Sequence, residues 1–518
     1  MSGISSAPQV AAVVLVAAAT LAIGTWGLRF SRTTSDFLVA SRTVRPGLNA
    51  SAVSGEYLSA ASFLGIAGLI LTFGADMLWY PVGWTAGYLV LLVMVAAPLR
   101  RSGAYTLPDF AEARLGSRAT RAAASVLVVV IGWLYLLPQF QGAGLTLGAA
   151  FGAPAWVGSL VVAVVVIVNV TSGGMRSITF VQAFQYWLKL TALLLPAVVL
   201  LMVWFGQGAP NPADAPVADL PDSAGAGLEA WSVPIGDAGG AQGLYLTYSL
   251  IVATFLGTMG LPHVVVRFYT NPDGGTARRT TLVVLALLGA FYVLPPVYGV
   301  LGRLHAEALA ASDRPDLLVL ELPRLMVPGL GGELLSALVT AGAFAAFLST
   351  SSGVAIAVAG VLGQDVTGRW LAHRPGGGIA AFRAGALLAI AVPLTVALAA
   401  PGIGVAQIVG LAFAVAASTF CPLLVLGIWW RGLTAPGAVA GLVVGGAGSG
   451  AGVLWTLLGS EATGWTAVLL AQPAAWSVPL AFGTMVGVSL ATRRRIPADA
   501  TRFMVRLHTP ETLPLDRG

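Results

Sequence analysis

The sequence predicts an all-α polytopic membrane protein with about 13 transmembrane helices. Hydrophobic residues make up 57% of its 518 residues, charged residues only 9%, and the mean hydropathy is +0.86. Soluble domains carry roughly 25% charged residues, so this chain has too few to cover a surface in water. Its single cysteine, Cys421, excludes a disulfide framework or a cysteine-built metal site. We therefore expect lipid to be the main solvent of the folded chain.

Thirteen apolar runs are long enough to cross a bilayer core of about 30 Å, which needs roughly 20 residues per helix. They are Val10–Leu28, Asn49–Thr72, Leu78–Ala97, Ala122–Ala149, Trp156–Val170, Ile178–Phe205, Leu244–Val266, Thr281–Leu301, Leu334–Leu362, Ala384–Ala400, Val405–Trp429, Ala435–Leu458 and Val468–Leu490. Signal peptides begin with a basic region, whereas Met1–Gln9 has no Lys or Arg, so we expect the first run to be a retained helix.

The arginines predict the orientation, because basic residues collect in cytoplasmic loops. Arginines follow every odd-numbered run, including Arg267, Arg278 and Arg279 after the seventh. The loop after the sixth run holds five acidic residues and no Lys or Arg: Asp214, Asp219, Asp222, Glu229 and Asp237. We expect the N-terminus outside and the C-terminus in the cytoplasm, and we attribute the pI near 9.7 to topology and not to a nucleic-acid partner. The preference for Arg over Lys suggests a GC-rich bacterium, hence a bacterial plasma membrane.

The second run contains small and hydroxyl residues around Gly55 and Glu56, and a good apolar helix resumes only after Ser62. One interpretation is a helix broken near Gly55–Leu58, whose second half begins at Ser59 and directs free N–H groups into the membrane centre. The other is a continuous helix whose small residues allow close packing.

Two further runs hold unusual residues. The seventh contains Gly257, Gly260 and Pro262, which would kink or open a helix, followed by His263. His263 could carry a proton or donate to a substrate, although a lone histidine more often bonds a carbonyl. The ninth contains four consecutive hydroxyl residues, 349–352. They could bond back to carbonyls four residues earlier, or offer the oxygens that a dehydrated cation such as Na⁺ needs.

Interrupted segments at corresponding positions of two halves are typical of transporters with inverted repeats. Because the breaks lie in the second and seventh runs, we expect one repeat to comprise runs two to six and the other runs seven to eleven. The expected organisation is 1–45, first transmembrane helix and cytoplasmic loop; 46–206, first inverted repeat; 207–243, extracellular acidic loop; 244–429, second inverted repeat; 430–492, spans 12 and 13; and 493–518, cytoplasmic tail.

The sixth run places Gln182, Gln185 and Lys189 on one helical face, at spacings of three and four. Lys189 is the only lysine in the chain and lies more than three turns beyond Arg176. Its long side chain could reach a water-filled cavity, touch a substrate or pair with Glu56, and the sequence leaves these possibilities open.

From about Asp36 to the last span, the sequence resembles the sodium–solute symporter family. The most specific pieces are 173–185 (GGMRSITFVQAFQ) and 348–352 (LSTSS). Three others, 57–65 (YLSAASFLG), 105–110 (YTLPDF) and 260–268 (GLPHVVVRF), are similar to the cation–acetate (monocarboxylate) symporter branch.

The resemblance implies a LeuT-type core of two inverted five-helix repeats, with a Na⁺ site between the broken second span and the ninth. By position, its ligands would be the carbonyls of Gly55, Leu58 and Ala346 and the hydroxyls of Ser349 and Thr350. Several family members carry an aspartate, tied to a second sodium site, where this chain has Gln182. The neutral Gln182 therefore favours one coupled cation. The branch often has Asp where Glu56 stands.

The predicted function is secondary active symport that couples inward Na⁺ flow to uptake of a small monocarboxylate such as acetate, by alternating access. Candidate substrate-binding residues are Glu56, Tyr57, Ser59, Ser62, Thr258, His263, Lys189 and Gln182. A proton-coupled monocarboxylate symporter and a Na⁺ symporter for another small solute are alternatives, since Glu56 and His263 could carry a proton. We expect no enzymatic activity and no cofactor. The expected partners are a small organic anion, Na⁺ or H⁺, and membrane lipid, with no nucleic acid.

Overall fold

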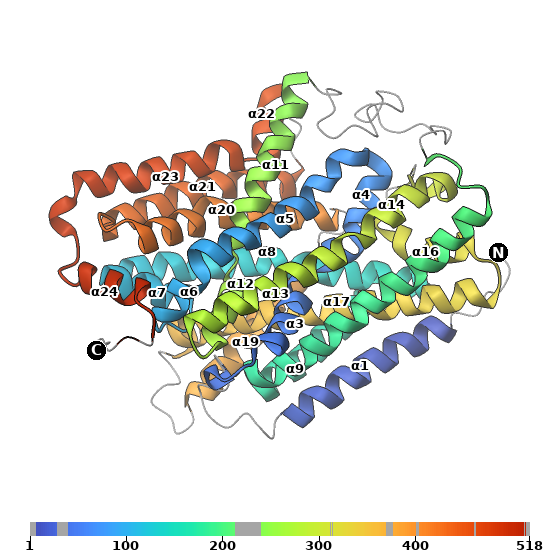
Figure 1. The fold of residues 1–518 in the computed structure, drawn as a ribbon, viewed down its shortest axis with the longest axis horizontal. Coiled ribbons are helices and arrows are strands. Elements are labelled where there is room, and N and C mark those ends of the chain that lie inside the picture. The colour runs from blue at the N-terminus through green and yellow to red at the C-terminus, as the bar shows by residue number, and fades with distance from the viewer. Residues whose placement is uncertain are drawn as a thin grey trace.

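The computed structural model describes residues 7–27, 40–212, 240–310, 312, 314–368, 377–399, 404–459, 463–511 and 513. These residues are almost entirely helical, and most of the long helices run along one direction (Figure 1). The five acidic residues of the expected extracellular loop lie outside the described residues. So do four arginines used for the orientation, namely Arg29, Arg32, Arg369 and Arg374.

Among the described residues, eleven helical runs are long and apolar enough to cross a membrane. Two of them each hold two expected spans. Gly74, with φ 78°, separates the second span from the third within residues 61–101. Gly174, with φ 59° and ψ −163°, interrupts the 52-residue α9 (Ala155–Gly206), which as one straight helix would measure about 78 Å. The eleven runs therefore contain the roughly thirteen expected spans, and the all-helical prediction is confirmed.

The main helices within the expected first repeat are α3 (Pro46–Tyr57), α4 (Ile66–Phe73), α5 (Trp79–Val90), α6 (Ala96–Arg101), α8 (Arg118–Phe151) and α9. Those of the second are α11 (Gly240–Gly260), α12 (Pro262–Val266), α13 (Gly274–Tyr292), α14 (Leu294–His305), α17 (Leu330–Leu362), α19 (Gly377–Ala399) and α20 (Val405–Trp429). The other long helices are α1 (Ala7–Gly27), α21 (Ala435–Leu458) and α23 (Ala474–Ala491). Shorter helices are α7 (Leu107–Leu115), α15 (Glu307–Ala310), α16 (Leu318–Met326), α22 (Gly464–Ala471) and α24 (Ala500–His508).

Helix α17 forms the centre of the bundle. Every residue from Val339 to Leu362 is buried, and α9, α8, α19 and α1 pack around it. A helix that is apolar on all sides is stable only where other helices cover it completely. Its small residues permit close contact: a Cβ on Gly342 would lie 2.5 Å from the Cβ of Ala192 on α9.

Both expected helix breaks are present. Helix α3 ends at Tyr57, Leu58 has φ −72° and ψ 89°, and the helical backbone resumes at Ala60. In the second repeat Leu261 has φ −72° and ψ 118°, and Pro262 opens α12. A proline fits this first helical position because it needs no hydrogen-bond acceptor there. The structure thus decides between the two interpretations of the second run in favour of the broken helix.

The 105–110 motif forms the start of α7 at the end of the bundle that the arginines assign to the cytoplasm. Thr106 and Asp109 form a reciprocal capping box, with the Asp109 amide donating to Thr106 Oγ1 over 3.2 Å. Buried Arg114 donates to the carbonyl of Gly427 (2.9 Å), and burial lowers the pKa of its guanidinium to about 10, so it stays protonated at neutral pH. Helix α7 is thereby fixed to the end of α20.

Arg121 joins three elements at the same end of the bundle. Its guanidinium contacts Asp109 (2.7 Å), Glu112 (2.9 Å) and Asp365 (2.8 Å). Asp365 also accepts a bond from Ser125 Oγ at 2.5 Å. This network links α7, α8 and the π-helical turn Gly363–Thr367 that follows α17.

We expect Arg121→Ala to lower the free energy of unfolding by about 2 kcal/mol, because three carboxylates lose their common partner. Arg118→Ala is the matched control, since Arg118 is exposed on the same helix turn. Thermal unfolding of the detergent-solubilised protein measures both. Equal melting temperatures for the two variants would contradict a stabilising role of the network.

Candidate functional site

The break after α3 exposes main-chain groups inside the bundle. The carbonyls of Gly55 and Leu58 point into the space between α3, α9 and α17, where they accept side-chain hydrogen bonds. The amide of Ala60 opens the second half-helix and donates to Oε1 of Gln139 on α8 over 2.9 Å. Sequence reasoning overlooked Gln139, although a polar residue in the middle of an apolar run was a visible signal.

Lys189 lies at the centre of these groups. Its side chain is fully buried, and its Nζ donates to the carbonyl of Gly55, to the carbonyl of Leu58 (2.8 Å) and to Oγ of Ser349 (2.8 Å). An ammonium has three donors, so all of them are used. The lysine ammonium therefore contacts three of the five residues predicted to ligate a sodium ion.

The two hydroxyls predicted as cation ligands bond across to α3. Ser349 Oγ lies 2.7 Å from the carbonyl of Gly55 and 3.1 Å from that of Ala346, and Thr350 Oγ1 donates to the carbonyl of Glu56 over 2.7 Å. The bonds to Gly55 and Glu56 cross to α3 and so differ from the return to a carbonyl four residues earlier that hydroxyls often make in helices. The bond to Ala346 is such a local return, three residues back. All five predicted ligand residues thus lie around the break, together with Lys189.

Glu56 pairs with Arg267 and not with Lys189. Arg267 Nε lies 2.5 Å from Glu56 Oε2, and both side chains are buried. The guanidinium also donates to Oγ1 of Thr179 (3.1 Å) and to Oε1 of Gln182. Gln182 in turn donates to the carbonyl of Ser349 over 2.8 Å. Glu56 and Gln182, both predicted to bind substrate, are therefore engaged in one buried polar network.

The assignment of Arg267 to a cytoplasmic cluster was wrong. Arg267 is fully buried and follows α12 directly, inside the bundle. The break in the seventh span brings the chain back toward α3, so that Arg267 contacts Glu56. The hydropathy pattern instead predicts that a loop begins at this arginine. Its position in the GLPHVVVRF motif, five residues after Pro262, was the available signal.

An aromatic cluster lies on the other side of the break. Phe413 of α20 contacts Tyr57, Trp84 and Tyr135, with ring centroids 6.3, 5.5 and 6.1 Å away. Tyr57 Oη lies 2.9 Å from Oγ1 of Thr258. The predicted substrate residues Tyr57 and Thr258 are thus in direct contact.

The remaining predicted substrate residues line the same region. Ser62 Oγ lies 2.9 Å from Oη of Tyr292, and the desolvated ring of Tyr135 lies against both Ser59 and His263. Among the buried side chains near the aromatic cluster, polar atoms that bond to no other described residue include both ring nitrogens of His263, Nε1 of Trp84 and Oη of Tyr88. These atoms can bond to a molecule that enters the region.

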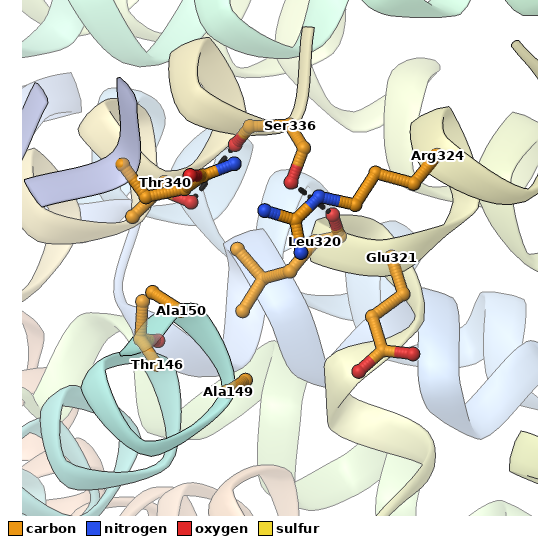
Figure 2. Close-up of a pocket in the computed structure, with 9 residues that line it drawn as sticks. Thr146, Ala149, Ala150, Leu320, Glu321, Arg324, Ser336 and Thr340 are labelled. Carbon is orange, nitrogen blue, oxygen red and sulfur yellow. Dashed lines mark hydrogen bonds between the residues drawn. The ribbon is translucent and has the colours of Figure 1, made fainter. Parts of the chain in front are cut away.

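A separate hollow lies near the N-terminal end of α17. Figure 2 shows Thr146, Ala149 and Ala150 of α8 opposite Leu320, Glu321 and Arg324 of α16, with Ser336 and Thr340 of α17 along the upper side. Ser336 Oγ donates to the carbonyl of Leu320 over 2.8 Å. None of the predicted site residues lines this hollow.

The fold and the central site define the class of protein: a polytopic helical transporter with two inverted repeats and polar groups gathered at paired helix breaks. The sequence profile of the sodium:solute symporter family matches residues 37–445, and the chain belongs to that family.

Two relatives cover nearly the whole chain. An uncharacterized symporter of Bacillus subtilis is 30% identical over 506 residues, covering 95% of this chain and 96% of its own. A monocarboxylic acid transporter of Corynebacterium glutamicum is 32% identical over 495 residues, covering 89% and 88%.

Solved structures confirm the fold. A Na⁺-coupled sialic acid symporter in a substrate-bound outward-open state has a TM-score of 0.66 at 15% identity, over 92% of this chain and 98% of its own. The nucleobase–cation symporter Mhp1 has a TM-score of 0.53 at 14% identity, over 92% and 99%. The expected LeuT-type architecture is therefore correct.

We expect Gly353→Ala to destabilise the protein, because the added Cβ would lie 2.1 Å from Cδ of Glu56. Overpacking costs about 1–3 kcal/mol, which outweighs the 0.5–1 kcal/mol that alanine usually gains over glycine in a helix. Gly378→Ala on α19 is the control, since nothing lies within 4 Å of its added Cβ. The melting temperature should fall for the first variant and hold or rise for the second. An unchanged melting temperature in Gly353→Ala would show that the Glu56 side chain can move away from Arg267 without a loss of stability.

Proposed function

We propose that this protein is a secondary active symporter that takes up a small monocarboxylate such as acetate together with a cation, by alternating access. Membership of the family supports symport, and the 32% identical relative named a monocarboxylic acid transporter supports the substrate class. The observation that carries the proposal is a set of buried polar groups beside the broken second span, on His263, Trp84 and Tyr88, that bond to no other described residue.

The aromatic cluster favours a small substrate over a large one. Its rings are all buried and in contact with one another: Tyr57, Trp84, Tyr135 and Phe413. The region therefore offers hydrogen-bond donors within an apolar wall. A carboxylate would gain charge-assisted hydrogen bonds there, and its short alkyl group would lie against the rings. Na⁺ and H⁺ are the two candidate cations. The family name and the five predicted ligand residues favour Na⁺, and the contact of Lys189 Nζ with three of those residues weighs against it.

Counterflow in proteoliposomes tests the transport activity. Vesicles loaded with unlabelled acetate should take up labelled acetate faster than vesicles without protein, and a panel of monocarboxylates should compete according to size. Competition by sugars or amino acids, with none by monocarboxylates, would overturn the substrate class.

We expect His263→Phe to raise the KM for acetate by about tenfold or more, because a hydrogen bond to a charged group contributes about 1.5–3 kcal/mol. Phenylalanine keeps an aromatic ring against Tyr135 and removes the ring nitrogens. His305→Phe is the matched control, because His305 also has a buried nitrogen that bonds to no described residue, but lies at the end of α14. Equal KM values for both variants and the original protein would exclude His263 from the binding site.

We also expect acetate uptake to be nearly independent of membrane potential. One cation moving with one monocarboxylate transfers no net charge, whereas each uncompensated charge would gain about 2.3 kcal/mol per 100 mV. Initial rates measured with and without a potassium diffusion potential of about 100 mV should agree. A large acceleration by an inside-negative potential would mean that more than one cation accompanies each anion.

A further inference from the structure

The polar tail that follows the last span folds back onto the helix bundle. After α23 the chain forms η12 (Arg493–Arg495) and then α24, which lies beside α6 and α7 at the end that the arginines assign to the cytoplasm (Figure 1). The apolar residues Phe503, Met504 and Leu507 have the spacing of a single helical face. Leu507 is fully buried, so this face of α24 is turned toward the bundle.

Two ring contacts hold α24 against neighbouring elements. The ring of Phe503 lies 6.2 Å from that of Phe110 on α7. The imidazole of His508 lies 4.8 Å from the ring of Trp429, the last residue of α20. The tail helix is therefore packed on both α7 and α20.

Arg101, the last residue of α6, and the tail bond to each other in both directions. Nε of Arg101 lies 3.3 Å from Oε2 of Glu511, and its Nη1 donates to the carbonyl of Leu507 over 3.4 Å. In return, Nε of Arg506 donates to the carbonyl of Arg101 over 3.2 Å. The Arg101 side chain is 10% exposed and that of Glu511 30%, so water and salt screen this ion pair only in part.

The second oxygen of Glu511 reaches the other repeat. Oε1 accepts a bond from the amide of Gly274 over 2.8 Å. Gly274 is the first residue of α13, where free N–H groups and the helix dipole favour a negative charge. A Cβ on Gly274 would lie 2.8 Å from Nε of Arg101, so the glycine leaves room for this arrangement. One carboxylate thus joins α6 of the first repeat to α13 of the second.

The tail bridges two groups of helices that meet at the central site. In the first group, Arg100 of α6 donates to the carbonyl of Asn271, four residues after Arg267, and α13 packs against α3. In the second group, Arg121 ties α7 to α8 and to the turn after α17, and Arg114 ties α7 to α20. Glu511 bonds to the first group, whereas Phe503 and His508 contact the second.

We propose that this tail, residues 493–511, is an autoinhibitory clasp that restrains the opening of the central site toward the cytoplasm, and that Glu511 closes the clasp. The inference rests on the proposed transport function, because a clasp of this kind acts on a conformational cycle. In alternating access one group of helices moves against the other around a fixed site.

The contacts of the tail favour the arrangement in which the central residues Glu56, Lys189 and Arg267 are buried. Breaking the clasp removes this preference and shifts the population toward arrangements that are open to the cytoplasm. The transport cycle then turns faster, while the folded protein loses contacts. An inhibitory clasp therefore predicts opposite changes in rate and stability.

The sharpest substitution is Glu511→Gln, which keeps the size of the side chain and removes its charge. Asp499→Asn is the matched control, because Asp499 is an exposed acid of the same tail whose side chain makes no cap bond to α24. Arg101→Gln removes the same ion pair from the other side, so the test does not depend on the folding of a single variant.

The first experiment measures counterflow of labelled pyruvate in proteoliposomes, since little of this monocarboxylic acid is undissociated at neutral pH. Glu511→Gln and Arg101→Gln should each raise the initial rate by about two- to fivefold, because a partly exposed ion pair and a charge at a helix N-terminus contribute modest free energies. Their melting temperatures should fall. Asp499→Asn should match the original protein in both. A lower melting temperature with an equal or lower rate would reduce the tail to a structural brace and overturn the proposal.

The second experiment locks the clasp. Arg101→Cys combined with Glu511→Cys should transport as fast as Glu511→Gln, and joining the two thiols with a bifunctional maleimide should bring the rate below that of the original protein. Labelling the same variant with a monofunctional maleimide should leave it fast. Cys421 is buried, which keeps it from the reagent. Equal rates after the two reagents would contradict the clasp.

The third experiment follows hydrogen exchange in the detergent-solubilised protein and needs no substrate. The amides of residues 500–508 and of Gly274 should exchange about two- to fivefold faster in Glu511→Gln than in the original protein or in Asp499→Asn. Unchanged exchange would overturn the role of Glu511.

The clasp and the proposed function fail separately. If pyruvate and other monocarboxylates show no counterflow, the proposed function is wrong, and faster exchange in Glu511→Gln would still support Glu511 as the residue that closes the tail onto the bundle. If monocarboxylates are transported and Glu511→Gln does not accelerate them, the clasp is wrong and the proposed function stands.

Discussion

Interrupting a helix in the middle of a bilayer leaves main-chain oxygens that no water can satisfy, and the centre of this protein is organised around that constraint. Each unsatisfied backbone group costs several kcal/mol in such surroundings. Here the carbonyls of Gly55 and Leu58 are satisfied by Lys189, and the amide of Ala60 by Gln139. The broken helix therefore depends on side chains from α8 and α9. The same exposed oxygens are what makes the position suitable for a cation.

Composition and local pattern predicted most of the fold from the sequence. Gly55, Gly260 and Pro262 marked both breaks because residues that weaken a helix are conspicuous within apolar runs. The hydroxyl ligands Ser349 and Thr350 were predicted from the sequence itself. The three carbonyl ligands were predicted only by family resemblance, since any residue possesses a main-chain carbonyl. Lys189 was recognised as deep, but its acceptors come from segments more than 130 positions away along the chain. Arg267 was misplaced because hydropathy treats a charge as the end of a span, and its partner Glu56 is 211 positions away.

The two buried cations near the break differ in what they can do. Arg267 makes an ion pair with Glu56 and adds bonds to Thr179 and Gln182, which suits a permanent link between η9 (Arg267–Thr270), α3 and α9. Buried ion pairs contribute little net stability, but removing one partner costs about 3–5 kcal/mol. Lys189 instead makes bonds to neutral oxygens only. One buried cation is held by an opposite charge, and the other by oxygens that the helix break leaves free.

The charges at the centre limit what the site can hold. Glu56 and Arg267 form an ion pair, so their charges cancel, whereas Lys189 makes its bonds to neutral oxygens only. An uncompensated charge is costly in the low-dielectric centre of the membrane. The oxygens around the break therefore surround a cation that has no opposite charge bonded to it, and the proposed anionic substrate would supply one.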